Sequence, residues 1–362
     1  MTTKIGIIGA GWYGCHIGLS LRALGFEVQI FEKNKRVLHE ASGNNQFRLH
    51  LGFHYARHHS TRIQSRDGFM RFIERYPGFS REVPDNIYAV PRLESLIDFQ
   101  TYRLIMSSSG LDYTETKENN LGLRNIDGII ISPERVLLIA QARKYFTESL
   151  SKDLQLNTDV TNLEINSKNI KINGSPFDFV IDCTWGHFSS LPINCYYEPT
   201  LLLYYECGTQ FPALTLVDGP LGSLYPTEDP NIYTLSSVPH TPIGRYKTAL
   251  EARAALAALS QQEINKKRLL MEDQIKYYLP SFGDHMRYIG PQFAIKTKPV
   301  GNADDRSCYV FRSDRLMTVL SGKIDTIFHA QERVLNFLET ALTGISMRAE
   351  SSLRREIEIG AF

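Results

Sequence analysis

The chain has 362 residues, of which 43% are hydrophobic and 22% charged, and its formal net charge is +1. This composition is typical of a globular protein, and the near balance of 40 basic and 39 acidic residues argues against nucleic acid as a partner. Five scattered cysteines without a CxxC pair favour a reducing compartment over a disulfide scaffold. The chain has no apolar run near the roughly 18 residues that span a bilayer and no signal-peptide pattern, so we expect a cytoplasmic protein with no transmembrane segment.

The N-terminal residues predict the first strand and turn of a dinucleotide-binding fold. A short, β-rich apolar run, residues 5–8, precedes Gly9, Gly11 and Gly14 in G-x-G-x-x-G spacing. In this spacing the first glycine permits a tight turn, the second lets the backbone approach a pyrophosphate, and the third allows close contact between helix and strand. The N-terminus of the following helix then faces the phosphates.

The elements after this turn agree with the same fold. The helix is predicted to run to about Gly25, which suits a C-cap, and residues 26–31 predict a second strand. Glu32 follows about 18 residues after the last glycine, where an acid accepts hydrogen bonds from the adenosine ribose. We therefore predict a dinucleotide site, and this pattern alone leaves NAD and FAD both open.

The next segment, "EASGNNQFRLHLGFHY" (residues 40–55), resembles the block that follows the second strand in the D-amino-acid-oxidase-like superfamily of FAD-dependent oxidoreductases. That superfamily includes glycine oxidase, sarcosine oxidase, glycerol-3-phosphate dehydrogenase and L-2-hydroxyglutarate dehydrogenase. The resemblance implies that this segment runs along the pyrophosphate and flavin. The cofactor contacts expected in this part of the chain are Lys33, Ser42, Gly43, Asn44, Asn45 and Gln46.

Two later segments resemble the same superfamily. "FDFVIDCTWGHFSSL" (residues 177–191) is similar to its strand-then-glycine signature, with a tryptophan inserted before the glycine, and "LMTVLSGKIDTIFHAQERVLNFL" (residues 316–338) is similar to a strand followed by a helix that begins at about residues 323–326. The resemblance implies that the N-terminus of this last helix points at the flavin and stabilises its anionic reduced form. The further cofactor contacts that it implies are Val160, Thr184, Gly186, Gly322, Lys323 and Ile324.

The expected cofactor is FAD, bound without a covalent link. Relatives with histidyl-FAD carry the histidine in the loop after the second strand, where this chain has Asn44 and Asn45. No cysteine lies in residues 316–326, where a cysteinyl link would be expected.

The resemblance implies an α/β fold in which a Rossmann-type FAD-binding domain carries an inserted α+β domain with an antiparallel sheet. The discontinuous FAD domain would comprise residues 1–84, 122–192 and 300–362, and the substrate domain residues 85–121 and 193–299. Within the FAD domain, "SPERVLLIAQARKYFTESL" predicts a helix with Ser132 as N-cap and Pro133 at its first position. Within the substrate domain, "TLLLYYECG", "GSLYP" and "NIYTLSSV" predict strands, and the stretch from 247 to 279 predicts helix. The charged tail, 351–362, is expected to be an exposed helix end or a loose terminus.

We expect an FAD-dependent oxidase or dehydrogenase that oxidises a small amine or 2-hydroxy acid by hydride transfer to flavin N5, with O2 or another electron acceptor. The protein must then orient the substrate, bind its anionic end and assist loss of a proton. Amino-acid-oxidising relatives carry a Gly-x-Arg-Pro segment where this chain reads "PQFAIKTKPVG", so a lysine replaces the arginine. The candidate catalytic residues are His50, Tyr55, His240 and Lys296, and the candidate substrate ligands are Arg48, Tyr225, Arg245 and Arg312.

Three other classes stay open. The first is a flavin enzyme of another reaction class, such as a monooxygenase or a biosynthetic dehydrogenase of a larger substrate. The second is a metal site, because His50, His54 and His58 recur every four residues, although Gly52 and the apolar residues between them disfavour one continuous helix. The third is a non-enzymatic nucleotide-binding module. We expect no metal, and we expect His58 and His59 at the exposed entry to a helix; substrate, electron acceptor, oligomeric state and pathway are not specified by the sequence.

Overall fold

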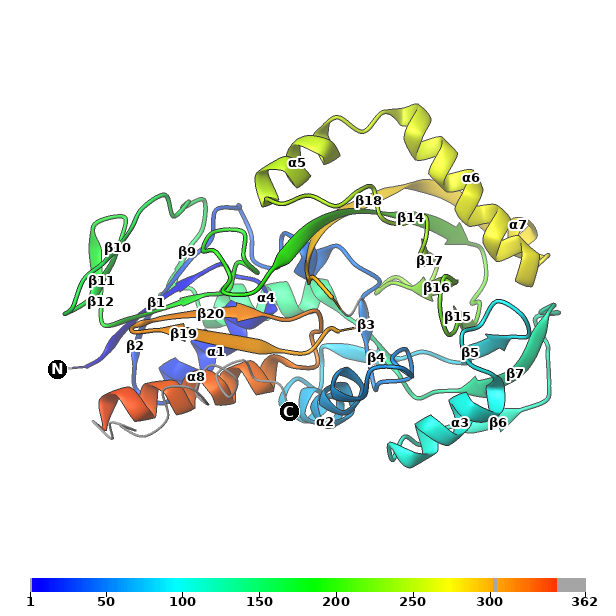
Figure 1. Ribbon diagram of the computed structural model, residues 1–362, viewed down its shortest axis with the longest axis horizontal. Helices are drawn as coiled ribbons and strands as arrows, with labels where there is room; N and C mark the ends of the chain where they lie inside the picture. The colour runs from blue at the N-terminus through cyan, green and yellow to red at the C-terminus, as the bar shows by residue number, and fades with distance from the viewer. Residues whose placement is uncertain (1, 302–304, 344–362) are drawn as a thin grey trace. The chain divides into compact units, whose positions relative to one another are not determined.

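The computed structural model describes residues 2–301 and 305–343, and its internal contacts divide the chain into two compact units (Figure 1). Unit 1 comprises Met1–Gly43, Ala140–Cys195 and Thr297–Phe362, and unit 2 comprises Asn44–Ile139 and Tyr196–Lys296. The charged tail, 351–362, lies outside the described residues. In the part of the chain that the structure describes, no helix is long and apolar enough to cross a membrane.

Unit 1 is built on a mainly parallel sheet with strand order β19-β20-β13-β1-β2-β9. Strand β1 lies in the middle and pairs in parallel with β2 on one side and β13 on the other. Its isoleucines are buried, as expected for a strand covered on both faces. The strands are β1 (Lys4–Ile8), β2 (Glu27–Phe31), β9 (Leu154–Gln155), β13 (Phe179–Asp182), β19 (Tyr309–Ser313) and β20 (Leu316–Leu320).

Helices α1 and α8 of unit 1 pack against each other (Figure 1). The helix α1 ends close to Gly25, whose positive φ of 89° suits the left-handed conformation that follows a helix. A small antiparallel sheet, β10-β11-β12, completes the unit. The bounds are α1 (Trp12–Ala23), the 3-10 turn η1 (Ala41–Gly43), α4 (Ile139–Ser149), β10 (Leu163–Ile165), β11 (Ile170–Ile172), β12 (Ser175–Phe177) and α8 (Ile327–Leu342).

Unit 2 is built on a mixed sheet with strand order β18-β14-β17-β16-β15-β5-β7-β6. Strand β15 pairs in parallel with β5, whereas the pairs β14–β17, β16–β17, β15–β16, β5–β7 and β6–β7 are antiparallel. The strands are β5 (Asn86–Pro91), β6 (Thr114–Thr116), β7 (Ile126–Ile131), β14 (Cys195–Cys207), β15 (Ala213–Leu216), β16 (Gly222–Pro226), β17 (Ile232–Ser237) and β18 (Met286–Pro299).

The two faces of this sheet differ in chemistry because side chains alternate along each strand. One face carries Leu203, Leu224 and Leu235, and α6 packs on it through Met271 and other apolar residues. The helices near this part of the chain are α5 (Ala249–Ala257), α6 (Gln261–Tyr278) and α7 (Phe282–His285). The stretch predicted as helix from 247 to 279 is thus helical, with a break at a second capping box.

The opposite face carries polar side chains on β16 and β17 and a smaller apolar cluster on β5 and β7. A three-stranded sheet, β3-β8-β4, contributes side chains that bond to this polar face. The remaining elements of unit 2 are β3 (Arg48–Leu49), α2 (His59–Arg75), β4 (Ser80–Glu82), α3 (Phe99–Ser108) and β8 (Arg135–Leu137). One face of the unit 2 sheet is therefore an ordinary apolar core, and the other contains buried polar groups.

The fold class predicted from the sequence is confirmed, while two local expectations differ. Residues 44–84 and 122–139, assigned to the FAD domain, belong to unit 2 by their contacts, because β8 pairs with both β3 and β4. The helix predicted to start at Ser132 and Pro133 begins only at Ile139. The prediction was wrong because Arg135–Leu137 forms strand β8, and the Ser132 hydroxyl accepts a hydrogen bond from Asn86 Nδ2 instead of capping a helix.

Candidate active site

The glycine-rich loop of unit 1 has the geometry that its spacing predicts. Gly9 has a φ of 95°, which side chains disfavour, and Gly11 is the N-cap of α1. A Cβ on Gly14 would lie 1.9 Å from the Gly9 carbonyl oxygen, and one on Gly11 would lie 2.8 Å from Ser42 Oγ. Ser42 Oγ in turn accepts a hydrogen bond from the Trp12 amide at 3.2 Å, so the Ser-Gly loop lies beside the start of α1.

Glu32 lies directly after β2 and is 7% exposed. Its Oε2 accepts a hydrogen bond from the Ala10 amide at 2.9 Å, and its Oε1 accepts from the Asn34 amide and side chain. The carboxylate therefore ties the glycine loop to the end of β2. Because each carboxylate oxygen has two lone-pair positions, Oε2 can also accept a hydrogen bond from a ribose hydroxyl.

The loop after β20 is fastened to the glycine-rich helix by Tyr13, a residue that sequence reasoning missed. The Tyr13 hydroxyl donates to the Lys323 carbonyl and lies 2.7 Å from Thr326 Oγ1. Thr326 Oγ1 also lies 2.8 Å from Ser321 Oγ, and helix α8 begins immediately afterwards at Ile327. No local signal identifies this tyrosine, because it occupies a variable position inside G-x-G-x-x-G and its partners are about 310 residues away.

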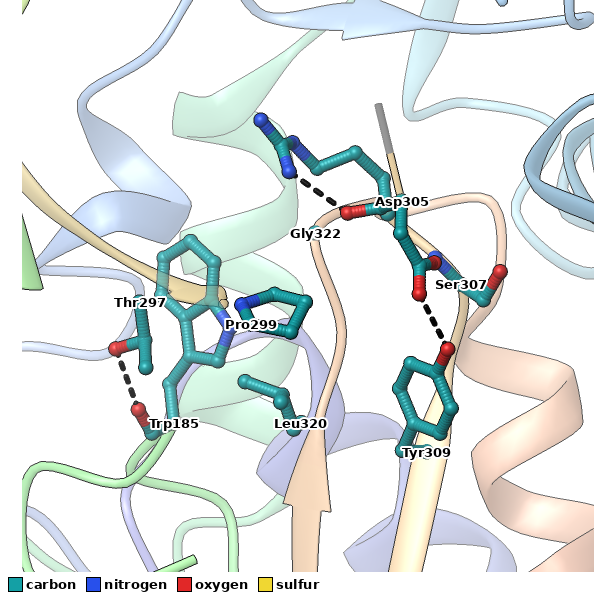
Figure 2. A pocket seen from close by; sticks show the side chains of 9 residues that line it. Trp185, Thr297, Pro299, Asp305, Ser307, Tyr309, Leu320 and Gly322 are labelled. Carbon is teal, nitrogen blue, oxygen red and sulfur yellow. Dashed lines mark hydrogen bonds between the residues drawn. The ribbon is translucent and has the colours of Figure 1, made fainter. Parts of the chain in front are cut away.

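A small pocket lies in unit 1 near the end of β20 (Figure 2). Trp185, Pro299 and Tyr309 contribute its rings, and Gly322 lies at its edge. The Trp185 carbonyl accepts a hydrogen bond from Thr297 Oγ1 at 2.7 Å, which fixes the turn that carries the indole. A Cβ on Gly322 would lie 2.5 Å from Arg306 Cδ, so a larger residue here would have to displace the Arg306 side chain.

The other predicted cofactor residues of unit 1 are distributed around the same sheet. Lys33 forms an ion pair with Glu40 at 3.1 Å, and Val160 is buried in an apolar cluster beside Phe31. Thr184 Oγ1 accepts a hydrogen bond from the Phe188 amide, and its amide bonds to Asp182. Three further predicted residues belong to unit 1. Gly43 packs against the Leu38 carbonyl, and Gly186 has a φ of 76°. The Ile324 carbonyl accepts a hydrogen bond from the Ile327 amide.

Asn44, Asn45 and Gln46, which were also predicted to contact the cofactor, begin unit 2. The Asn45 carbonyl accepts a hydrogen bond from Gln292 Nε2 at 3.1 Å. The Gln46 side chain bonds to Ser223 of β16 through both its oxygen and its nitrogen. Gln46 thus fastens the incoming chain to the polar face of the unit 2 sheet.

The described residues of unit 1 fit a bound dinucleotide flavin. The glycine loop leaves no room for side chains, the first turn of α1 contains no acidic residue, and Glu32 stands at the end of β2. These are the groups that a pyrophosphate and a ribose require.

A cluster of buried polar side chains lies on the polar face of the unit 2 sheet. Arg48 is 5% exposed, donates from Nη1 to the Tyr88 hydroxyl at 3.1 Å, and places its guanidinium carbon 4.0 Å from the centre of the Tyr225 ring. The Tyr88 hydroxyl donates to Glu134 Oε2 at 2.6 Å. Asn86, two residues before Tyr88, is also fully buried.

Glu134 is fully buried and remains ionised. Burial by itself raises its pKa, but the hydrogen bond and charge of His50, the charge of Arg48 and the hydrogen bond from Tyr88 lower it to about 2. The Leu51 amide also donates to Glu134 Oε1 at 2.8 Å. The predicted residues Arg48, His50 and Tyr225 thus meet in one cluster, together with residues that the sequence did not indicate.

The histidine run from 50 to 59 is not one helical face. The chain is irregular from His50 to His58, His58 is the N-cap of α2 with Nδ1 accepting from the Thr61 amide at 3.2 Å, and His59 is the first helical residue, as expected. The Tyr55 ring lies 5.9 Å from His50 and 5.2 Å from His54. Among the described residues, no group of three or more His, Cys, Asp or Glu side chains could hold a metal ion.

The remaining predicted residues, His240, Lys296, Arg245 and Arg312, have other surroundings. The His240 carbonyl accepts a hydrogen bond from Lys267 Nζ at 3.0 Å, and burial and Lys267 lower the pKa of His240. Lys296 is half-buried on β18. Arg245 is exposed and lies over Tyr196, whereas Arg312 belongs to unit 1 and bonds to the Asp314 carbonyl beside the β19–β20 turn.

Comparison with known proteins agrees with this geometry. A family model for NAD(P)-binding Rossmann-like domains matches residues 7–70. The solved structure of glycine oxidase from Geobacillus kaustophilus superposes with a TM-score of 0.69 at 15% identity and covers 94% of this chain and 95% of that chain. L-α-glycerophosphate oxidase from Mycoplasma pneumoniae, solved with FAD bound, also gives 0.69, at 14% identity, over 93% of this chain and 95% of that chain.

The chain has the D-amino-acid-oxidase-like fold, as the sequence resemblance implied. FAD is its cofactor. The chain belongs to the family of the FAD-dependent monooxygenase FPY4 of Fusarium mangiferae, to which it is 58% identical over 336 residues, 93% of this chain and 91% of that protein. The FAD-dependent monooxygenase kojA of Aspergillus flavus is 26% identical over 92% of this chain and 85% of its own length.

These relatives correct the reaction class expected from the sequence. An oxidase or dehydrogenase of a small amine or 2-hydroxy acid was the main expectation, and it is wrong, because the family to which the chain belongs is that of a monooxygenase. The other class left open, a flavin enzyme such as a monooxygenase, agrees with the relatives. The error arose because the cofactor motifs are shared across reaction classes, and the similarity to amino-acid-oxidising flavoenzymes extends only to the fold.

Proposed function

We propose that this protein is an FAD-dependent monooxygenase that inserts one atom of O2 into a small organic substrate. The observation that carries the proposal is the 58% identity to a monooxygenase over 93% of the chain, which includes both units. In the overall reaction, one oxygen atom forms a new C–OH group and the other leaves as water. The two electrons and the balancing protons come from an external donor of the nicotinamide type.

The residues proposed to hold FAD are those whose geometry fits its parts. The loop Gly9–Gly14 and the start of α1 would bind the pyrophosphate, Glu32 would bind the adenosine ribose, and Ser42, which bonds to the start of α1, would adjoin the phosphates. Thr184, Gly186 and the loop Gly322–Ile324 complete the set in unit 1. Bound FAD supplies the two-electron redox chemistry and the activation of O2.

Unit 2 supplies the groups proposed to bind the substrate. Arg48, Tyr225 and His50 are brought together on the polar face of the sheet, whose burial excludes bulk water. The buried tyrosine hydroxyls remain protonated, since burial raises the pKa of Tyr88 and Tyr225 well above the ordinary value. They therefore act as neutral hydrogen-bonding groups and not as bases.

The proposal is tested on purified protein with its flavin bound. Under anaerobic conditions we expect NADH or NADPH to bleach the flavin, and we expect a panel of amino acids, N-methyl amino acids and 2-hydroxy acids to leave it oxidised. Once a substrate is identified, the oxygen isotope of labelled O2 must appear in the product, and the oxygen isotope of labelled water must not. Bleaching by an amino or hydroxy acid alone, with no oxygen incorporated, would reject the proposal.

A further inference from the structure

Arg48 of unit 2 presents one complete edge of its guanidinium without a partner. Nη1 bonds to Tyr88, whereas Nε and Nη2 are both buried and have no hydrogen-bond partner among the described residues. In an arginine side chain, the Nε–H and one Nη2–H point in parallel from the same edge of the plane. This edge is the fork that binds two oxygen atoms of a carboxylate or a similar anion.

Arg62, a second buried arginine in unit 2, differs from Arg48 in its hydrogen-bond partners. Arg62 is 6% exposed, and each of its three nitrogens has a partner: Nε donates to Ser109 Oγ, Nη1 donates to the carbonyls of Tyr55 and Ala56, and Nη2 lies 3.3 Å from His59 Nδ1. Arg62 is therefore a structural cation. Arg48, equally buried, retains two donors that cost free energy unless a ligand accepts them.

The surroundings of Arg48 carry two further orphaned groups on the same face of the sheet. Asn86 Oδ1 and Thr215 Oγ1 are fully buried and also have no partner in the part of the chain that the structure describes. Thr215 is the cross-strand partner of Tyr88, and Asn86 Nδ2 lies 3.4 Å from the Tyr225 hydroxyl. Thr215 therefore lies opposite Tyr88, and Asn86 lies beside Tyr225.

The charge of Arg48 is balanced without occupying its fork. Glu134, the ionised carboxylate of the cluster, receives its hydrogen bonds from Tyr88 and the Leu51 amide and lies 3.7 Å from His50. A direct ion pair would have taken both donors of the guanidinium. The Tyr88 hydroxyl instead stands between Arg48 and Glu134, so Glu134 offsets the charge of Arg48 without bonding to its Nε–Nη2 edge.

We propose that the Nε–Nη2 edge of Arg48 binds an oxyanion of the substrate, with Thr215 and Asn86 bonding to atoms beside it. The inference rests on the proposed function only in identifying the ligand as the substrate. Two classes of ligand carry the required pair of oxygens, a carboxylate and the enolate of a 1,3-dicarbonyl compound. Arg48 is the residue that restricts the substrate to molecules with such a group.

The test measures binding of two probes to the flavin-loaded protein by calorimetry at neutral pH, with neither reductant nor turnover. Benzoate represents the carboxylate, and cyclohexane-1,3-dione represents the enolate. We expect wild type to bind at least one of them, and Arg48→Lys to raise its Kd at least tenfold, because a lysine cannot reproduce a two-donor fork. Arg62→Lys is the matched control, expected to lower the melting temperature and leave the probe Kd within about twofold.

The two probes distinguish the two classes of ligand. Binding of benzoate alone assigns a carboxylate, and binding of the dione alone assigns an enolate. No binding of either probe to wild type, or an unchanged Kd in Arg48→Lys, overturns the inference. If Arg48→Lys yields no folded protein, Thr215→Val decides: a Kd raised at least threefold supports the site, and an unchanged Kd rejects it. Because the readout involves no oxygen chemistry, failure of the monooxygenase proposal would leave this result intact.

Discussion

In unit 1 the cofactor loop is made of backbone, because Gly9, Gly11 and Gly14 remove the side chains that would fill it. In unit 2 the polar cluster is made of side chains, and Arg48, Tyr88 and Glu134 come from three separate strands or loops. The first arrangement depends on space and the second on charge and hydrogen bonds. Substitutions in the two regions should therefore fail in different ways, sterically in unit 1 and electrostatically in unit 2.

The largest effect is expected from Gly14→Ala in unit 1. Its Cβ would lie 1.9 Å from a backbone oxygen, which cannot move aside as a flexible side chain would. We expect protein without flavin and a loss of stability of about 3 kcal/mol, measured by flavin absorbance and by urea unfolding. Gly208→Ala, where nothing lies within 4 Å of the new Cβ, is the control and should retain its flavin. A flavin-loaded Gly14→Ala protein would refute the steric account.

The next effect is expected from Glu134→Gln in unit 2, and it depends on pH. The pKa of Glu134 in the folded protein is about 2, below its ordinary value of 4.5, so its charge stabilises the fold above about pH 4.5 and this contribution is lost as the pH falls toward 2. The shift corresponds to about 3 kcal/mol. Wild type should therefore exceed the variant by about this amount at pH 7, and the difference should shrink on acidification.

Urea unfolding at a series of pH values measures that difference. Glu206→Gln is the control, because Glu206 pairs with Arg287 on the surface and its loss should cost less than about 1 kcal/mol at any pH. A difference between wild type and Glu134→Gln that stays constant from pH 7 to pH 3 would contradict the electrostatic account of unit 2.

A smaller effect is expected from Tyr13→Phe, which keeps the ring and removes the bonds to Lys323 and Thr326. Stability should fall by about 1 kcal/mol, since one or two hydrogen bonds are lost. The Kd of the flavin-free protein for FAD should rise severalfold, because the loop after β20 loses its tie to α1, and a fluorescence titration with FAD measures it. Tyr277→Phe, at a half-exposed tyrosine in α6, should change neither quantity.

The smallest effect is expected from His58→Ala. His58 caps α2 by accepting from the Thr61 amide, so its loss should cost about 1 kcal/mol and leave the flavin content unchanged. Thermal unfolding with and without added zinc gives the second readout. If zinc stabilised wild type and had no effect on the variant, the histidine run would have to be reconsidered as a metal site.

The fold was largely predictable, because the glycine spacing, Glu32 and the alternating apolar residues of each strand are local features of the sequence. Half of the unit 2 cluster could not be predicted from the sequence. Arg48 and Tyr225 could be suspected as cation and aromatic residue, but Tyr88 and Glu134 join them only through the pairing of β5 with β15 and of β8 with β3. The register between strands that are far apart in the sequence cannot be recognised from the local sequence. The alternation of Asn86 and Tyr88 with apolar neighbours was the one available signal of a polar sheet face.

The cofactor-binding motifs do not predict the reaction class, and the reason is chemical. The flavin carries out the redox step, and the protein residues that hold it are the same whether the enzyme removes a hydride or transfers oxygen. The proposed monooxygenase activity therefore rests on a relative that matches 93% of the chain, and not on any residue in the site.

The bond from Tyr13 to Thr326 joins residues 313 positions apart, and strand β13 likewise pairs with β20 from the far end of the chain. During synthesis the glycine loop is made about 310 residues before the segment that completes its surroundings. Unit 1 can therefore close only after β20 has been made, and until then the edge of β13 that pairs with β20 stays open.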